Sequence, residues 1–172
     1  FAEKYPTYIN KLIIADISPR SHKALLEHDS NANFHLNLLS IMRSLKLNEY
    51  KDYRSLSKEL IVHGETIKNV IIKNVGKENG KFYWRINVEA LFQNLNNIME
   101  GLNPDDFIDK KIEVETLFLR AKLSNYITRS DEKLIDFIFA NYRIADIENA
   151  GHWLHYDNPE DTANIIQEFV LT

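Results

Sequence analysis

Three short apolar segments, at residues 12–15, 114–119 and 143–147, most constrain the fold of this chain. Apolar runs of this length that end at turn signals are typical of buried parallel strands. Apolar spacing predicts a helix at residues 130–140, between the second and third segments, and another at residues 159–171. Strands that alternate with helices predict an α/β fold with a parallel sheet.

Residues 21–103, between the first two predicted strands, follow a different pattern. Apolar residues recur there at helical spacing in four places, at residues 34–45, 56–61, 67–75 and 88–100. Gly76 is expected to end the third helix, and Asn79-Gly80 predicts a tight turn before a short strand-like run. We therefore expect a mostly helical insertion that serves as a cap or lid.

Residues 1–20 and 104–172 would then form one core with only three parallel strands. Typical sheets have about five or six strands, so three favour a chain that is part of something larger. Residues 1–8 resemble the end of a helix, and the chain starts at Phe1 without Met. We expect this chain to be the C-terminal part of a longer protein, and a small three-stranded protein is the alternative.

The composition excludes several classes of function. The formal net charge is −4 and no long Lys/Arg cluster is present, which argues against nucleic acid as a partner. No apolar run approaches the roughly 20 residues that span a bilayer, and we expect a cytoplasmic location. The absence of cysteine excludes disulfides and thiol nucleophiles. We expect no cofactor. We also expect no metal site, because metal-ligand spacing with acidic partners is missing at His22, His28, His35 and His63.

One histidine, His152, has the setting of a general base. It follows the small pair Ala150-Gly151 and precedes a helix signal, with Asn158 as the expected N-cap. A histidine on a short loop between two rigid elements is held in place, as proton transfer requires. A base also needs a nucleophile, which this motif does not supply. The alternative is a loop histidine with a structural role.

Three segments, taken in order, resemble esterases of the α/β-hydrolase family. They are Asp-Ile-Ser-Pro at residues 16–19, Phe-Tyr-Trp-Arg-Ile-Asn at residues 82–87 and Ala-Gly-His-Trp at residues 150–153. The branch that the chain resembles includes the bacterial YbfF esterase and mitochondrial abhydrolase-domain proteins. The resemblance implies that this chain supplies the last three core strands and the helical cap. The family's Gly-x-Ser-x-Gly elbow does not occur in this chain, so the resemblance implies that the nucleophilic serine and the oxyanion hole lie upstream of it.

The resemblance also implies a Ser-His-Asp triad that cleaves acyl esters, with His152 as the base. The family's usual position for the acid is the loop after residue 119, which here offers Asn125 and no carboxylate. Some members of the branch use an Asp one strand earlier, and this position matches Asp16. Asp16 also follows a predicted strand, at the sheet edge where α/β proteins place their chemistry. Its alternative role is to cap the next turn with Ser18.

Two other acids, Glu89 and Asp131, are runners-up, although each lies where the first turn of a helix favours an acid anyway. The preferred substrate contacts are Met42, Trp84 and Trp153, and His155 is expected at the edge of the pocket. The cap supplies further apolar candidates, whose spacing fits simple core packing equally well: Phe34, Leu38, Tyr83 and Phe92.

We therefore expect a serine carboxylesterase or thioesterase. Its partners would be a small-molecule acyl ester and the N-terminal part of the same hydrolase, which carries the nucleophile. The isolated chain should be inactive. The alternatives are a non-catalytic hydrolase-like module that binds a ligand, and another α/β-hydrolase reaction such as dehalogenation.

Overall fold

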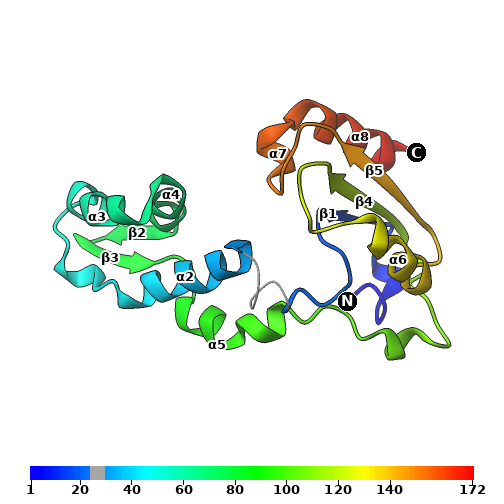
Figure 1. Ribbon diagram of the computed structural model, residues 1–172, viewed down its shortest axis with the longest axis horizontal. Coiled ribbons are helices and arrows are strands. Elements are labelled where there is room, and N and C mark those ends of the chain that lie inside the picture. The colour runs from blue at the N-terminus through cyan, green and yellow to red at the C-terminus, as the bar shows by residue number, and fades with distance from the viewer. Residues whose placement is uncertain (24–29) are drawn as a thin grey trace. The chain divides into compact units, whose positions relative to one another are not determined.

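The computed structural model describes residues 1–23 and 30–172. They form two compact units, Phe1–Ser21 with Gly101–Thr172 and His22–Glu100. The first unit holds the parallel sheet, and the second holds helices and a small hairpin (Figure 1). His28, one of the histidines considered above, lies outside the described residues.

A three-stranded parallel sheet forms the centre of the first unit. In spatial order its strands are β1 (Lys11–Ala15), β4 (Glu115–Ala121) and β5 (Tyr142–Ile147). The register pairs Ala15 with Leu119, and Ala121 with Ile147. All three strands therefore end at one edge of the sheet. The predicted parallel α/β arrangement is confirmed, with strand bounds that differ from the prediction by one or two residues.

Helices cover both faces of this sheet (Figure 1). Phe118 packs with residues of α6 (Glu132–Ile138) on one face, and its neighbours Leu117 and Leu119 pack with residues of α8 (Pro159–Leu171) on the other. All three side chains are fully buried, and each such burial contributes about 2 kcal/mol to the hydrophobic driving force. The alternation along β4 thus gives the sheet two apolar faces.

The last helix of this unit begins at a side-chain cap. The Asn158 side chain accepts a hydrogen bond from the Asp161 N–H at 3.3 Å, so α8 starts as predicted. A four-residue helix precedes it, α7 (Leu154–Asp157). The helix predicted at residues 130–140 is shorter in the structure, because a 3₁₀ turn forms its first residues and Phe139 after its last turn is extended. The 3₁₀ helices of this unit are η1 (Pro6–Tyr8), η4 (Pro104–Phe107) and η5 (Arg129–Asp131).

The first residues do not form the α-helix end that the sequence suggested. One turn is closed by a hydrogen bond from the Tyr5 N–H to the Phe1 carbonyl, and the 3₁₀ helix η1 follows it. Pro6 explains the change, because it has no N–H to continue an α-helical pattern from the preceding turn.

Among residues 22–23 and 30–100, the described part of the second unit, there are four α-helices and a hairpin. They are α2 (Ser30–Ser44), α3 (Tyr53–Leu60), α4 (Glu65–Lys73), α5 (Val88–Ile98), β2 (Val75–Glu78) and β3 (Lys81–Trp84), with the 3₁₀ helices η2 (Leu47–Glu49) and η3 (Ile61–His63). Their core includes the buried side chains of Met42, Leu56 and Ile71. Asn79 and Gly80 both have positive φ, 48° and 79°, as the predicted two-residue turn requires.

The hairpin corrects the predicted end of the third helix. The C-cap of α4 is Asn74, whereas Val75 and Gly76 already belong to β2. Gly76 lies opposite Tyr83 on β3, and a Cβ at this glycine would overlap the Tyr83 ring. The glycine is therefore needed for close strand packing and does not end the helix.

Candidate active site

Asp16 occupies the carboxyl end of β1 and is completely buried. Its backbone N–H donates to the Leu119 carbonyl at 2.8 Å, which extends the pairing of β1 with β4. Its φ of +46° lies in the left-handed region that few residues other than glycine adopt. Backbone conformations of this kind persist where the surrounding structure fixes them, and they cluster at functional sites. The position of the Asp16 carboxylate is thus set by the sheet.

The Asp16 carboxylate contacts the histidine of the last loop. Oδ2 of Asp16 lies 3.0 Å from Nδ1 of His152, and Oδ1 accepts a hydrogen bond from the Ala121 N–H at 3.0 Å. The two side chains are 136 positions apart in the sequence. They meet because parallel strands bring their carboxyl ends to one edge. The structure thus brings together the two residues that the sequence analysis selected as catalytic.

The two side chains differ sharply in exposure. The Asp16 side chain is 0% exposed, whereas that of His152 is 42% exposed. When Nδ1–H of the imidazole donates to the carboxylate, Nε2 carries the free lone pair. A buried acid behind a half-exposed imidazole can therefore orient a base whose second nitrogen is available for proton transfer.

The loop that carries His152 is held on both sides. The Gly151 N–H donates to Oδ2 of Asp157 at 2.8 Å, and the Ala150 carbonyl accepts from the Leu123 N–H at 2.9 Å. Ala150 is fully buried, and Asn149 before it has a φ of +55°. The small pair Ala150-Gly151 thus brings the chain tightly against the sheet edge.

Tyr126, in the loop after β4, stacks on His152. The ring centroids are 4.1 Å apart and the planes differ by 26°. No motif or spacing in the sequence predicts a role for this residue. Its one signal was its place after a buried strand, at the edge where Asp16 and His152 lie.

An ion-pair network joins β4 and β5 beside this site. Arg120, next to the amide that binds Asp16, reaches Asp146 of β5 at 2.5 Å and Glu132 of α6 at 2.6 Å. The hydrogen bond from Arg120 lowers the pKa of the Asp146 carboxyl, and the pKa of Arg120 is raised in turn. The network therefore holds together the strand ends that frame the site.

Comparisons with known proteins identify relatives of this chain. No family model matches the chain. It is 30% identical to the sn-1-specific diacylglycerol lipase ABHD11 of Danio rerio, with 96% of this chain and 50% of the relative covered. A putative esterase/lipase of Haemophilus influenzae is 26% identical over 96% of this chain and 53% of its own length. The chain spans about half the length of these curated relatives.

Solved structures similar to this chain are also hydrolases. A structure described as a marine microorganism esterase is 31% identical, with a TM-score of 0.85 over 98% of this chain and 64% of its own. This chain has the α/β-hydrolase fold, and it is related to esterases that share this fold. E-2-(acetamidomethylene)succinate hydrolase, at 15% identity and a TM-score of 0.64, shares the fold alone. The three strands and their helices correspond to the C-terminal part of an α/β-hydrolase.

The other candidate acids of this α/β-hydrolase chain are bound to arginines. Asp131, 3% exposed, accepts from the Thr128 N–H at 2.7 Å and lies 2.8 Å from Nε of Arg20. Glu89 lies in the helical unit, where it pairs with Arg43 at 2.7 Å. The contacts of Asp131 are those of a helix cap with an ion pair.

Replacing Asp131 by Ala should lower the free energy of unfolding of the full-length hydrolase by about 3 kcal/mol, because a buried cap and ion pair are lost together. Denaturant titration measures this loss. The exposed Asp109 provides the matched control, since Asp109→Ala should change stability by less than about 0.5 kcal/mol. Equal effects of the two substitutions would contradict the structural role of Asp131.

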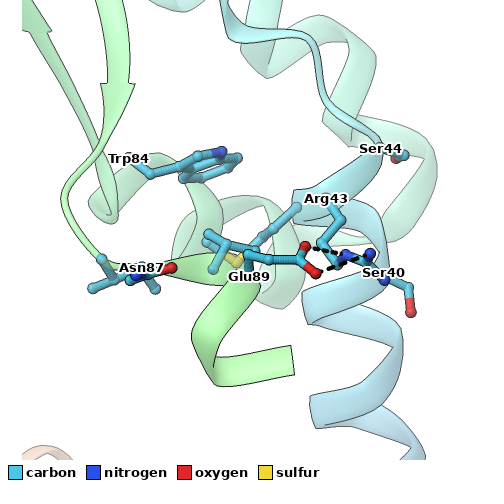
Figure 2. Close-up of a pocket in the computed structure, with 9 residues that line it drawn as sticks. Ser40, Arg43, Ser44, Trp84, Asn87 and Glu89 are labelled. Carbon is cyan, nitrogen blue, oxygen red and sulfur yellow. Dashed lines mark hydrogen bonds and ion pairs between the residues drawn. The ribbon is translucent and has the colours of Figure 1, made fainter. Parts of the chain in front are cut away.

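The predicted substrate contacts lie in different surroundings. Met42 is 1% exposed in the core of the helical unit, and it borders a hollow of about 630 Å³. Trp84 lines the same hollow (Figure 2). The Arg43–Glu89 ion pair lines the same hollow (Figure 2). Trp153 is 46% exposed beside His152, and its ring lies nearly parallel to that of His155, 6.3 Å away.

The other apolar candidates of the helical unit divide into two groups. Leu38 lies in its core, and Phe34 and Phe92 pack against that core, whereas Tyr83 is 47% exposed.

Within the described residues, no group of three or more His, Asp or Glu side chains is placed to hold a metal ion. In that same part of the chain, no helix combines the length and apolar character that a membrane span needs.

Proposed function

We propose that the protein containing this chain is a carboxylic ester hydrolase in which His152 is the general base and Asp16 orients it. The observation that carries the proposal is the 3.0 Å contact between Nδ1 of His152 and the buried Asp16 carboxylate at the carboxyl edge of the sheet. The relationship to esterases supports the reaction class.

The nucleophile is a serine in the part of the hydrolase upstream of this chain. Nε2 of His152 takes the proton of the serine hydroxyl as its oxygen attacks the acyl carbonyl. The ester C–O bond breaks, and the imidazolium gives the proton to the leaving alcohol. Water then attacks the acyl-serine by the same route, with His152 again as base. Asp16 holds the imidazole in the correct tautomer and stabilises its cationic form.

The substrate is an acyl ester with an apolar acyl group. Two observations support this class: relatives are named as a diacylglycerol lipase and as an esterase/lipase, and the aromatic Trp153 stands half-exposed beside His152. The helical unit is the cap of this hydrolase, and Met42 and Trp84 are substrate contacts within it. The mechanism uses no cofactor.

The test combines turnover with labelling in the full-length protein. It should hydrolyse p-nitrophenyl acetate, butyrate and octanoate, and a fluorophosphonate probe should label a single serine upstream of this chain. The separate 172-residue chain should do neither. A folded full-length protein that neither hydrolyses these esters nor reacts with the probe would contradict the proposal. Such a result would favour a hydrolase-like binding module or a different reaction.

A further inference from the structure

Tyr126 places an aromatic face against the imidazole of His152. The centroid distance of 4.1 Å and the interplanar angle of 26° describe two rings in face contact. This contact is separate from the hydrogen bond to Asp16, which lies at the Nδ1 edge of the imidazole. The imidazole is thus held at one edge by Asp16 and on one face by Tyr126.

The loop that carries Tyr126 is itself tied to the segment after Asp16. The Tyr126 carbonyl accepts from the Ser18 N–H at 3.1 Å, and the Tyr126 N–H donates to Oγ of Ser124 at 3.2 Å. Nη2 of Arg20 donates to the Asn125 carbonyl at 2.8 Å. Ser18 and Arg20 follow Asp16 within four residues, so the segment that begins with Asp16 also holds the loop that carries Tyr126.

We propose that Tyr126 is a positioning residue for His152, a role that rests on the proposed hydrolase function. A single hydrogen bond at Nδ1 leaves the half-exposed imidazole free to tilt about the bond to Asp16. Contact with the Tyr126 face removes this freedom, and a positioned base transfers protons faster than a mobile one. An aromatic face also attracts a cation, so it favours the imidazolium that forms during the reaction. Both effects act on the chemical step more than on substrate binding.

Substitutions at Tyr126 in the full-length hydrolase distinguish the effect of the aromatic ring from the effect of its hydroxyl group. Tyr126→Leu should lower kcat for p-nitrophenyl butyrate by about tenfold with KM nearly unchanged, because the contact is with the base and acts mainly in the chemical step. Tyr126→Phe keeps the stacked face and should retain a kcat close to that of the wild type. Tyr126→Met provides a second loss of the ring in case the leucine variant does not fold.

NMR of the imidazole gives a readout that a general loss of stability would not move. The ring current of Tyr126 should shift the carbon-bound protons of His152 upfield in the wild type and in Tyr126→Phe. The shift should vanish in Tyr126→Leu and Tyr126→Met. Tyr156, 78% exposed and four residues from His152, offers the matched control, because Tyr156→Leu should leave both kcat and these signals unchanged.

Three results would overturn the positioning role. They are an unchanged kcat in Tyr126→Leu, an equal loss in Tyr126→Phe, which would assign the effect to the hydroxyl, and a rise in KM at constant kcat, which would indicate a substrate contact. Failure of the proposed function gives a different pattern. In that case His152→Ala would itself retain turnover, whatever the Tyr126 variants do.

Discussion

The His152→Ala variant of the full-length hydrolase should lose nearly all ester hydrolysis, with kcat reduced by a factor on the order of 10⁵ or more. Without the imidazole, no group is placed to accept the serine proton or to return it to the leaving alcohol. The substrate still has its apolar contacts, so KM should change little. Steady-state rates with p-nitrophenyl esters measure the loss, and the reaction of the serine with a fluorophosphonate probe should slow in parallel.

A second histidine variant controls for the chemical change itself. His63 is exposed on the 3₁₀ helix η3, in the helical unit, and His63→Ala should retain the wild-type kcat. A folded His152→Ala protein with turnover close to that of the wild type would remove His152 from the mechanism. The 3.0 Å contact with Asp16 would then be a structural hydrogen bond only.

Local signals in the sequence were sufficient for most elements of the sheet unit. Short apolar runs predicted the three strands, and Asn158 with Pro159 predicted the start of α8, because these residues act within one turn of the chain. The resemblance to esterases selected Asp16 over Asn125, and the parallel topology explains how Asp16 reaches His152. The pairing itself could not follow from local pattern alone, because it depends on which strands are neighbours.

Two of the misses come from contacts between residues that are not neighbours in the sequence. Gly76 looked like the end of a helix, since a glycine after helical spacing commonly has that role. Its actual reason is the Tyr83 ring on the facing strand. Tyr126 had no signal for the same reason, because its stacking on His152 depends on two loops that meet only in the fold.

Asp16→Asn should lower kcat by a factor of about 10⁴ while leaving the fold intact, because the uncharged amide can neither stabilise the imidazolium nor fix the productive tautomer. If the amide presents its N–H to Nδ1 of His152, the imidazole proton moves to Nε2, and the base can no longer accept the serine proton. Asn is the most selective replacement at this position. It matches Asp in shape and tolerates the left-handed φ of +46°, which alanine would adopt only with strain.

The amide also keeps an oxygen that can accept the Ala121 N–H, so the contact between the ends of β1 and β4 survives. Thermal unfolding should therefore show a melting temperature close to that of the wild type, which separates a catalytic loss from a structural one. Asp109→Asn, the same change at an exposed site, should change neither kcat nor the melting temperature. If Asp16→Asn were as active as the wild type, the acid of the triad would have to be sought elsewhere. Asp131 and Glu89 would be weak replacements, because Arg20 and Arg43 already bind their carboxylates.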